Sequence, residues 1–580
     1  MLKLRGTFGP GAAETAPAVP AGWCWETGPG FHLQYEPGHP SCTVRRDPTG
    51  VVIGERHLIQ DQPSDPARRD GSWLELRWTP AGMEIITDRL GTIPVHWAVR
   101  GRTFYFATRL ADVARLLPGA VEPDPAAVLT TIFLDHPWGS RTLLRDVHLL
   151  PPASRCRIPG TGADPVCDRY WLPPVPEVGD PGSVEPWLEA ATERLRQAHV
   201  RHAADLDPET VAMPVTAGLD SRCNLALHPD LALCARLFHC HDLANVEWPY
   251  ARRIGRHLRR PIERFDSADD MRHAPGFNPD LGPGDFNIGH WRLVGTARRL
   301  AATGSRATVD GFLQDLLFKA TFLREQSREQ QIQGHLARLR YNAAALGFGP
   351  DSPQVRRVEE CIREDFPAGD TGLEASQRHY LENRSRRLVY NIVRLNQNYL
   401  DVRTPALDHA LMDFALALPW QLRKGSWLYR RIIQRLSPEL AGIPYDKTGL
   451  PLLSPRPRSL GKATARQLRP FLNRVWPGRQ FFQPPEGNFA RLARHDPLFR
   501  ATARGTLSGS EWLRAILATD SPEDVLRTPR NMGPQRIDCL GGMLTASRLE
   551  SATRQSRQAA TAVPEASATP STGHHQGVLP

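Results

Sequence analysis

The sequence predicts a mixed fold, in which an α+β N-terminal domain is followed by an α/β domain with a parallel sheet and many helices. In residues 1–165, short segments alternate apolar and polar residues, as antiparallel strands do. In residues 191–550, short apolar strands alternate with helical segments, an order that favours a parallel sheet with crossover helices. Residues 166–190, which include Pro173-Pro174-Val175-Pro176, predict a linker between the two domains.

Each element of the first domain is predicted from its local pattern. The predicted strands cover residues 73–78, 83–87, 94–99 and 103–108. A turn at Arg100-Gly101-Arg102 joins the last two strands into a hairpin. The predicted helices cover residues 110–117 and 124–134, and the second begins at an Asp-Pro pair.

The composition predicts a soluble protein of the cell interior. Apolar residues make up 41% and charged residues 23% of the 580 residues, as in globular proteins. No apolar run approaches the roughly 20 residues of a membrane-spanning helix, and residues 1–5 lack the apolar stretch of a signal peptide. The nine cysteines are scattered and form no C-x-x-C pair, which indicates reduced thiols. We therefore expect a cytoplasmic protein that does not bind membranes.

The net charge of +10 is spread along the chain in short clusters such as residues 256–260. Because these clusters are not interleaved with aromatic residues, the sequence disfavours nucleic-acid binding, whereas a basic surface suits small anionic substrates. The cluster Arg384-Ser385-Arg386-Arg387 is expected to form a solvated or phosphate-facing surface. Only five of the 72 basic residues are lysine, so any lysine in a candidate site stands out.

The second domain is organised around a strand, a small-residue turn and a helix. Residues 211–215 form an apolar run, and Thr216-Ala217-Gly218 forms the turn. Amide groups at the start of the following helix favour an anion, and the hydroxyls of Thr216 and Ser221 add donors. The Asp220 carboxylate would repel phosphate unless Mg2+ lay between them. The pattern indicates a nucleotide-phosphate loop with a metal-binding aspartate, or else an ordinary strand–turn–helix that Asp220 caps.

Two further strands, residues 231–241 and 262–265, are predicted on either side of a helix over residues 247–258. The first of them ends in His239-Cys240-His241-Asp242, and alternation sends its two histidines to one face. This arrangement permits zinc binding. Because no further ligands cluster nearby in the sequence, residues of a strand end or a nucleotide pocket are the preferred interpretation.

Three later segments carry candidate site residues. After an apolar strand, a glycine turn leads to Asp315, which is either a ligand at the sheet edge or a helix cap. Residues 401–408 fit a helix-terminal turn held by Arg403 and Asp408, and this is the preferred reading of Asp408. Lys447 lies in a loop bounded by proline and glycine, from which it either reaches phosphate or a developing oxyanion or remains at the surface.

In their order along the chain, these segments resemble the ATP pyrophosphatase domain of asparagine synthetases. Thr216-Ala217-Gly218-Leu219-Asp220-Ser221 is similar to the pyrophosphate loop S-G-G-x-D-S, with threonine and alanine at the first two positions. Gly311, Asp315, Leu317 and Phe318 match the family segment G-x-G-x-D-E-L-F, whose aspartate binds Mg2+ beside the pyrophosphate.

The resemblance is less complete at the end of the site that serves the acceptor. Phe312 stands where relatives have an acidic or tyrosine residue for acceptor chemistry, and Leu313 replaces the second glycine. Residues 401–408 resemble E-x-R-x-P-F-L-D, with Asp401 in place of the leading glutamate. In β-lactam synthetase-like relatives this carboxylate helps the base, and relatives place a catalytic lysine in the loop that holds Lys447 here.

The first domain resembles the class II glutamine amidotransferase domain of asparagine synthetases, which implies an αββα, Ntn-hydrolase-like fold. The resemblance rests on residues 88–97, 106–109 and 142–144. Active members use a cysteine at residue 2, exposed by removal of the first methionine, as nucleophile and base. Here residue 2 is leucine, and Cys24 and Cys42 are internal. We expect a degenerate domain that does not hydrolyse glutamine and remains as a structural partner.

The resemblance implies an ATP-dependent, AMP-forming ligase that makes amide bonds. Its substrates would be a carboxylate-bearing small molecule or peptide, and ammonia or the substrate's own amine; partner proteins of a biosynthetic pathway are also expected. The product would be asparagine or, as in β-lactam synthetases and lasso-peptide cyclases, an intramolecular amide. The implied site residues are Thr216 to Ser221 and Gly311 for ATP, Asp220 and Asp315 for Mg2+, and Lys447 and Asp401 for catalysis.

Two other functions remain open from the sequence. Phe312 and the altered pair Thr216-Ala217 favour a non-catalytic scaffold that binds adenine nucleotides. The positive charge favours an RNA-modifying enzyme of the ATP pyrophosphatase fold, but the amidotransferase-like first domain and the lack of an RNA-binding module speak against it. Residues 551–580, rich in Ala, Ser, Thr, Pro and Gln, are expected to be disordered.

Overall fold

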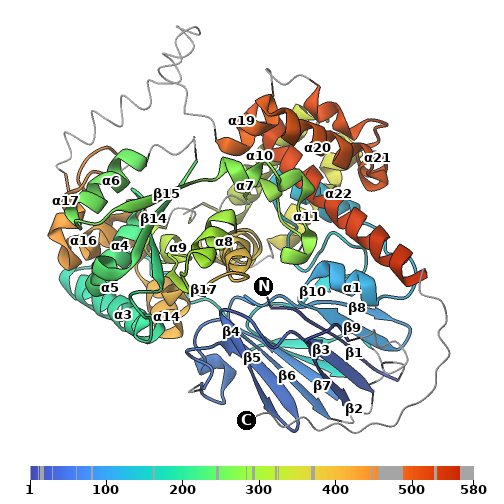
Figure 1. The fold of residues 1–580 in the computed structure, drawn as a ribbon, viewed down its shortest axis with the longest axis horizontal. Coiled ribbons are helices and arrows are strands. Elements are labelled where there is room, and N and C mark those ends of the chain that lie inside the picture. Colours follow the sequence, from blue (N-terminus) through green and yellow to red (C-terminus); the bar gives the residue numbers. More distant parts are fainter. Residues whose placement is uncertain are drawn as a thin grey trace.

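Antiparallel sheets form the N-terminal part of the molecule, and a parallel sheet with many helices follows (Figure 1). This arrangement confirms the predicted mixed architecture. No helix in the described part of the chain is both long and apolar enough to cross a membrane. The computed structural model describes the chain except for residues 1, 11, 13–18, 29, 61, 80–81, 161–162, 243–246, 283, 291–293, 321–322, 324–325, 367–371, 446–447, 455–486, 528–531 and 562–580.

Two six-stranded antiparallel sheets pack face to face in the N-terminal part. The strands of the first sheet are β1 (Leu4–Phe8), β2 (Cys24–Gly28), β3 (Phe31–Tyr35), β8 (His96–Arg100), β9 (Thr103–Ala107) and β10 (His148–Leu149). The strands of the second are β4 (Cys42–Asp47), β5 (Gly50–Glu55), β6 (Trp73–Thr79), β7 (Gly82–Thr87), β11 (Ser154–Pro159) and β12 (Val166–Arg169). Alternating apolar residues of both sheets, among them Leu4, Phe106 and Leu74, form the buried core between them.

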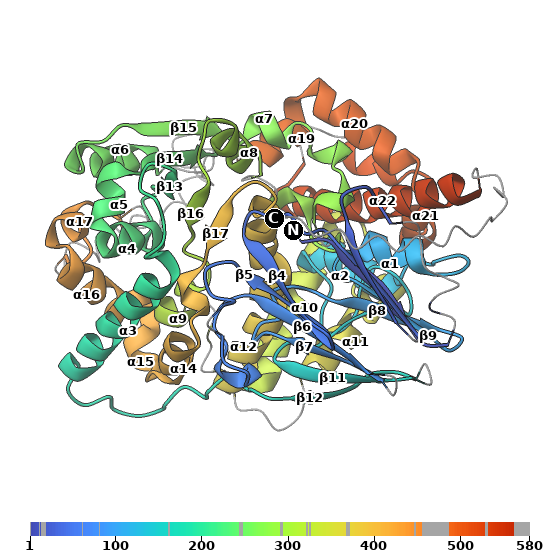
Figure 2. The ribbon, with the colours of Figure 1, turned by 60° about the horizontal axis from the view of Figure 1, so that its bottom comes forward.

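The helices predicted in this part are confirmed as α1 (Leu110–Leu116) and α2 (Pro125–Leu134). α1 packs on β8 and β9 of the first sheet. The second sheet, whose strands β5, β6, β7 and β11 lie side by side in Figure 2, instead carries charged side chains on its outer face, including Arg77, Glu84 and Arg155. Residues 1–165 therefore supply one helical layer, and the two-layer αββα arrangement expected for them is corrected.

A five-stranded parallel sheet forms the centre of the second part. Its strands are β13 (Val211–Pro214), β14 (Arg236–His241), β15 (Ile262–Asp266), β16 (Ala307–Val309) and β17 (Asp401–Arg403). They lie in the order β15-β14-β13-β16-β17. In the register of the central strands, Ala212 pairs with Arg236 on one side and with Thr308 on the other.

Helices cover both faces of this sheet because the central strand is apolar on both sides. The helices of this part are α3 (Glu185–Ala203), α4 (Leu219–Leu227), α5 (Pro229–Cys234), α6 (Trp248–His257), α7 (Ala268–Met271), α8 (Val294–Ala302), α9 (Gln314–Lys319), α12 (Gly372–His379), α13 (Tyr390–Asn396), α14 (His409–Ala417), α15 (Trp420–Arg423), α16 (Trp427–Leu436) and α17 (Pro438–Gly442). Val211 and Met213 pack with residues of α5 and α6, whereas Ala212 packs with residues of α8.

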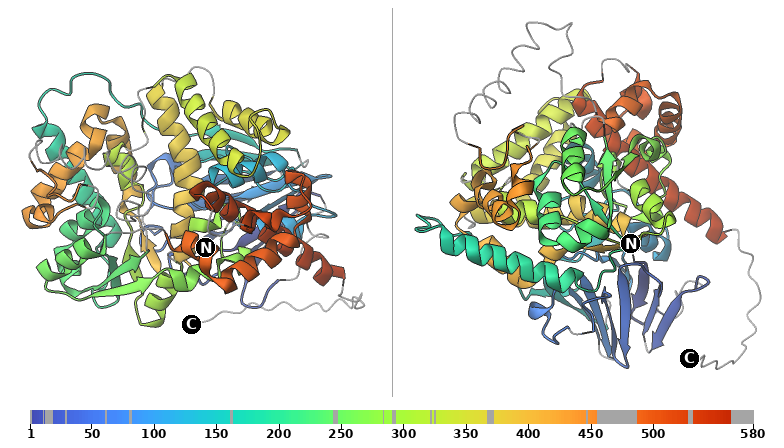
Figure 3. Two further views of the ribbon diagram at one scale, coloured as in Figure 1. Left: turned by 90° about the horizontal axis from the view of Figure 1, so that it is seen from above. Right: turned by 60° about the vertical axis from the view of Figure 1, so that its left-hand side comes forward.

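The C-terminal helices return to the N-terminal part (Figures 1 and 3). They are α19 (Asn488–His495), α20 (Pro497–Ser508), α21 (Glu511–Leu517) and α22 (Pro534–Thr561). α22 packs against α1 and α2, and α10 (Arg328–Ala345) and α11 (Pro353–Asp365) pack on α2. One hydrophobic cluster, which includes Leu129, Leu336 and Leu540, joins these helices. The helical layer over the first sheet therefore comes from distant parts of the chain.

Three local predictions are corrected. The first residues of the expected linker are regular structure, because β12 pairs with β11. The strand expected over residues 231–241 begins at Arg236, since Pro229 starts the short helix α5. α22 runs to Thr561, so the first residues of the expected disordered tail are helical.

A disulfide joins Cys156 and Cys167, in contrast to the expectation of reduced thiols. The two residues lie opposite each other in the register of β11 and β12. The sequence gives no sign of this pairing because the spacing of the cysteines does not reveal which strands are neighbours. The described cysteines outside this disulfide include Cys24, Cys42, Cys223, Cys240, Cys361 and Cys539.

Most of the basic cluster at residues 384–387 is buried, which corrects its expected exposure. It lies in a π-helix, η5 (Tyr380–Val389), that continues into α13. Arg386 donates hydrogen bonds to the carbonyl oxygens of Leu150 (2.7 Å) and Gly91 (3.2 Å). Arg387 forms an ion pair of 2.6 Å with Asp285. The cluster therefore holds loops of the N-terminal part against the helices of the second part.

The Arg387–Asp285 pair yields a stability prediction. Burial would raise the pKa of Asp285, but the Arg387 guanidinium, together with His96, holds it well below its usual range. Because Asp285→Asn leaves a buried guanidinium without its counter-charge, it should lower the free energy of unfolding by about 3–5 kcal/mol. Urea unfolding at pH 7.5, followed by tryptophan fluorescence, measures this change.

The exposed pair Arg356–Asp351 provides the matched control, because its side chains are 66% and 90% exposed. Asp351→Asn should change the free energy of unfolding by less than about 1 kcal/mol. Equal, small effects of the two substitutions would contradict the structural role given to Arg387.

Candidate functional site

The candidate site lies where the strand order of the parallel sheet reverses. β13 is the first strand in sequence, and the chain adds β14 and β15 on one side of it, then β16 and β17 on the other. At such a reversal the loops that follow neighbouring strands diverge and open a crevice at the carboxyl ends of the strands. Residues 216–218 follow β13 and residues 310–313 follow β16, so two of the predicted segments meet at this crevice.

A pocket of about 560 Å³ occupies the crevice, a volume within the usual range for small-molecule sites. Of the predicted ATP and Mg2+ residues, Thr216, Asp220, Ser221, Gly311 and Asp315 line it. The other lining residues are Pro214, Phe238, Cys240, Asp242, Glu247, Thr296, Ala297, Leu300, Thr308, Asp310, Phe312, Leu313, Val389, Asn396 and Leu400.

The loop after β13 is ordered by its own hydroxyl groups. The Thr216 and Ser221 hydroxyls are 2.8 Å apart, and the Gly218 amide donates to Thr216 Oγ1 at 3.1 Å. α4 begins at Leu219, and its N-cap, Gly218, offers no side chain to cap the first turn. The start of α4 therefore keeps the amide groups and the positive dipole end that favour an anion. The alternative prediction, in which Asp220 caps the helix, is wrong, because the N-cap is Gly218.

Two residues of the loop lie behind its surface, and the backbone amide of one of them already has a partner. Ala217 and Leu219 are fully buried and do not line the pocket. The Ala217 amide donates to Oε2 of Glu247 at 3.3 Å. A carboxylate therefore accepts a hydrogen bond from one of the amides expected to receive phosphate, and an incoming phosphate would have to displace it.

Gly311 allows the two segments of the site to approach each other closely. A Cβ atom at this position would lie 2.6 Å from Cβ of Asp220, well inside the normal contact distance. Any larger residue would therefore push the segment after β16 away from the loop after β13. This close approach explains why the turn before Asp315 needs glycine.

Three of the carboxylates that line the pocket come from the loop after β13 and the segment after β16: Asp220, Asp310 and Asp315. Burial raises the pKa of Asp310 to about 6, and the neighbouring Asp220 adds to this shift. Burial and Asp220 also raise the pKa of Asp315. The sequence analysis identified Asp220 and Asp315 but missed Asp310, which follows β16 directly and has no counterpart in the quoted family segment.

A lysine lies beside one of these carboxylates. Lys319, at the end of α9, is buried and places its ammonium nitrogen 2.5 Å from Oδ2 of Asp220. Its ammonium also lies 5.9 Å from the ring centre of Tyr429, whose hydroxyl donates to Gln314. The scarcity of lysine in this sequence was the only signal that pointed to Lys319.

The arrangement fits a bound Mg2+ ion. Oδ1 of Asp220 is buried and, among the residues that the structure describes, has no hydrogen-bond partner. The Lys319 ammonium pairs with only one of the three carboxylates, and carboxylate oxygens are the ligands that Mg2+ prefers. Asp220 and Asp315 are the residues that would hold the ion.

Arg222 connects the loop after β13 to the segment that precedes Lys447. Its side chain is fully buried. The guanidinium donates to the carbonyl oxygen of Ala217 (3.2 Å) and to those of Ile443 (2.6 Å) and Pro444 (3.2 Å). One side chain on α4 therefore fixes the distance between two segments that are more than 200 residues apart in sequence.

Two predicted catalytic residues are not brought into this pocket by the described structure. Asp401 follows Leu400, which lines the pocket, but the Asp401 side chain does not; its Oδ2 accepts from Nε of Arg403 at 2.8 Å. Lys447 lies outside the described residues. Both roles stay predictions. Asp408, in contrast, accepts from the Leu411 amide as the N-cap of α14, which confirms its structural interpretation.

Phe312 forms an aromatic wall of the pocket. Its ring packs against Tyr390 with 4.8 Å between the ring centres. At the end of β14, Cys240 and Asp242 also line the pocket, as expected for strand-end residues. His239 bonds through Nδ1 to the carbonyl oxygen of Val215, and no three-residue cluster of metal-ligand side chains in the described part includes it.

Comparison with known proteins adds little to this geometry. No protein-family model matches the sequence, and no curated protein matches it significantly. One solved structure to which the chain is similar is described as "Structure of the allosteric regulatory enzyme of purine biosynthesis". The two share 10% identical residues with a TM-score of 0.19, and the match covers 46% of this chain and 80% of that one. A similarity of this size carries no argument about function.

The raised pKa of Asp310 yields a pH-dependent stability prediction. A carboxyl whose pKa rises from 3.8 to about 6 on folding destabilises the folded state once it ionises. Without Mg2+ or nucleotide at pH 7.5, Asp310→Asn should therefore raise the free energy of unfolding by up to about 3 kcal/mol. The gain should shrink as the pH falls through 6 and vanish below about pH 4.

Urea unfolding at a series of pH values measures this difference. The exposed Asp230→Asn controls for the change in net charge. An Asp310→Asn protein that is less stable than wild type at pH 7.5 would contradict the proposed environment of Asp310.

Proposed function

We propose that the protein is an ATP-dependent ligase that forms amide bonds by chemistry of the asparagine synthetase type. The observation that carries the proposal is the convergence of two separate segments, residues 216–221 and 310–315, on one pocket at the reversal of the sheet. Both segments resemble the family in residue type and in order along the chain. The same edge of a parallel sheet is the usual place for a nucleotide.

The phosphate groups of ATP are proposed to bind at the start of α4. The free amides of the first turn and the hydroxyls of Thr216 and Ser221 are the donors there. Asp220 and Asp315 would hold Mg2+, which when bound supplies positive charge next to the leaving pyrophosphate. Lys319 adds a fixed positive charge beside Asp220.

The proposed first step activates the carboxylate substrate. A carboxylate oxygen attacks the α-phosphorus of ATP, a new P–O bond forms, and the bond to the bridging oxygen breaks. Pyrophosphate leaves, and the product is an acyl-adenylate. The task of the pocket in this step is to hold the two reactants in line and to stabilise the charge of the leaving group.

The proposed second step forms the amide. The amine nitrogen attacks the acyl carbon, the C–N bond forms, the C–O bond to AMP breaks, and the amine loses one proton. Asp310 is the lining carboxylate best suited to accept this proton, because its pKa of about 6 lies close to neutral pH. Lys447 remains the lysine proposed to stabilise the tetrahedral intermediate.

Free ammonia or an amine of the substrate is the proposed nitrogen source. Residue 2 is leucine, its side chain is buried in the core between the sheets, and its carbonyl oxygen accepts from Thr108 Oγ1 at 2.8 Å. Burial raises the pKa of the Cys42 thiol, which makes it a poor nucleophile. The N-terminal part is therefore proposed to act as a structural partner without glutaminase activity.

A non-catalytic nucleotide-binding scaffold is the second candidate. The ion pair of Lys319 with Asp220 favours it, because the ammonium already neutralises one carboxylate expected to hold Mg2+. The hydrogen bond from the Ala217 amide to Glu247 also favours a scaffold, because a phosphate would have to displace this carboxylate. A scaffold of this kind would bind ATP with or without Mg2+ and would not turn it over.

The proposal is tested by pyrophosphate release from ATP and Mg2+ with a panel of carboxylic acids and peptides, each with ammonia. Pyrophosphate and AMP should form in equal amounts with at least one acceptor. Asp220→Ala and Asp315→Asn should each lower the rate at least about 100-fold, since both remove charge that acts on the leaving group. Asp230→Asn, outside the pocket, should keep the wild-type rate.

Other outcomes identify the alternatives. ATP binding without turnover for every acceptor would favour the scaffold. Glutamate released from glutamine at the rate of amide formation would contradict the loss of glutaminase activity. AMP formed only with an RNA substrate would favour an RNA-modifying enzyme.

A further inference from the structure

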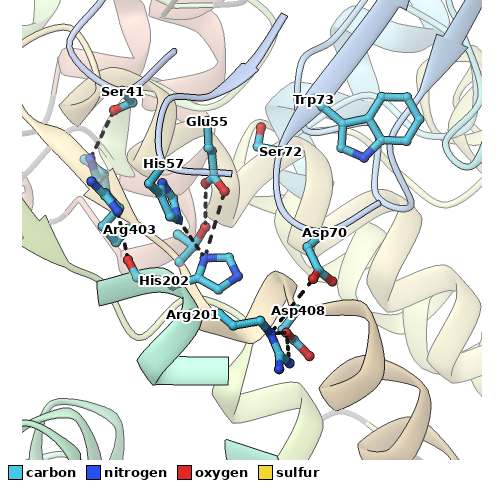
Figure 4. Close-up of polar contacts among 12 residues, drawn as sticks. Ser41, Glu55, His57, Asp70, Ser72, Trp73, Arg201, His202, Arg403 and Asp408 are labelled. Atoms are coloured by element: carbon cyan, nitrogen blue, oxygen red, sulfur yellow. Dashed lines mark hydrogen bonds and ion pairs between the residues drawn. The ribbon is translucent and has the colours of Figure 1, made fainter. Parts of the chain in front are cut away.

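A second cluster of functional side chains lies away from the nucleotide pocket, between the two parts of the molecule. Glu55 ends β5, and His57 follows two residues later, so both come from the N-terminal part. His202 lies in the last turn of α3, in the second part. In Figure 4 contacts join the His202 ring to both the Glu55 carboxylate and the His57 ring.

The distances within this cluster fit ligands of one metal ion. One ligand atom from each residue lies within 4.8 Å of the other two. Nε2 of His57 is 3.4 Å from Nδ1 of His202, which is 3.9 Å from Oε2 of Glu55. Metal–ligand bonds of about 2.0–2.2 Å in tetrahedral geometry separate ligand atoms by roughly 3.3–3.6 Å, so small shifts would complete the site.

The polar atoms of the cluster lack satisfactory partners. Glu55 is 2% exposed and His202 is fully buried. Oε2 of Glu55 has no hydrogen-bond partner among the described residues, and Oε1 is 3.4 Å from the Thr404 hydroxyl. The contact between the two imidazoles is long for a hydrogen bond. Buried polar atoms rarely lack a hydrogen-bond partner unless an ion or a water molecule binds to them.

A neighbouring cluster of similar composition shows the contrast. Asp70, Asp408 and His409 also place three ligand atoms within 4.8 Å of one another. There, however, Arg201 donates to Asp408 Oδ2, the Leu411 amide donates to Oδ1, and His409 bonds to Asp70. Its carboxylates are satisfied by protein donors and need no metal ion.

Arg403 is a cation that acts on Glu55 and His57, and its charge is already balanced. It pairs with Asp205 (2.8 and 2.9 Å) and with Asp401 (2.8 Å). It also donates to the carbonyl oxygen of His202 at 3.0 Å, which fixes the end of α3. Arg403 therefore positions His202 without acting as the counter-ion of Glu55.

We propose that Glu55, His57 and His202 bind a Zn2+ ion that joins the two parts of the molecule. Two imidazoles and one carboxylate are a donor set that suits zinc, and the fourth position is free for a water molecule. His57 and His202 are 145 positions apart in the sequence. The ion would therefore cross-link distant segments and stabilise the folded state. This proposal does not depend on the proposed ligase activity.

Zinc content of the full-length, untagged protein tests the proposal. After incubation with Zn2+ and desalting, inductively coupled plasma mass spectrometry should find one zinc ion per chain. His57→Gln and Glu55→Gln should each weaken zinc binding at least about 100-fold, since even the loss of an outer partner costs 10–100-fold. Zinc should raise the melting temperature of wild type and leave that of His57→Gln unchanged.

Three controls separate this site from others. His409→Gln tests the satisfied neighbouring cluster, Asp220→Ala tests the nucleotide pocket, and a His574→Ala, His575→Ala double variant tests the C-terminal histidine pair. Each should still bind one zinc ion. Circular dichroism in EDTA checks that every variant folds.

Cobalt absorption of the wild-type protein gives a readout that needs no variant. Co2+ bound at this site should show the intense visible bands of a tetrahedral ion, and equimolar Zn2+ should abolish them. The proposal is overturned if wild type retains no zinc, if the double tail variant or Asp220→Ala loses it, or if folded Glu55→Gln and His57→Gln bind it as tightly as wild type.

Discussion

The reversal of strand order between β13 and β16 decides where the nucleotide pocket lies. Because the two strands are neighbours and their following loops diverge, the first turn of α4 and the carboxylates after β16 face one pocket. Gly311 lets the two segments touch, and the buried Arg222 fixes the loop after β13 to the segment before Lys447. If either contact were lost, the donors and the carboxylates would no longer share a site.

Charge balance links the pocket to its proposed chemistry. Burial raises the pKa of Asp310 and Asp315. In the same low-dielectric surroundings, a bound cation attracts these carboxylates more strongly than it would in water. Lys319 offsets one of these charges but leaves Oδ1 of Asp220 unpartnered among the described atoms. The two parts of the molecule are joined by other charged side chains, since the buried Arg386 donates to the carbonyl oxygens of Gly91 and Leu150, and Arg89 pairs with Asp413. Within the second part, Arg387 with Asp285 and Arg403 with Asp205 form ion pairs between segments far apart in sequence.

Features that depend on neighbouring residues could be predicted from the sequence. The apolar run at residues 211–215, its small-residue turn and the helix after it follow from local periodicity and turn chemistry, and so does the cap formed by Asp408. Features that depend on distant contacts could not. Lys319 meets Asp220 across 99 positions, the burial of Arg387 requires Asp285, and the disulfide requires the register of β11 and β12. The return of α22 onto α1 and α2 is equally invisible to a local pattern.

The central claim is that the start of α4 receives the phosphates of ATP, and a crystal structure with Mg2+ and a saturating amount of α,β-methylene ATP tests it most directly. The account predicts that the polyphosphate lies on the amide groups after Gly218, between the Thr216 and Ser221 hydroxyls, and that Glu247 has left the Ala217 amide. A nucleotide bound elsewhere, or a loop that keeps its bond to Glu247 at saturation, would contradict it.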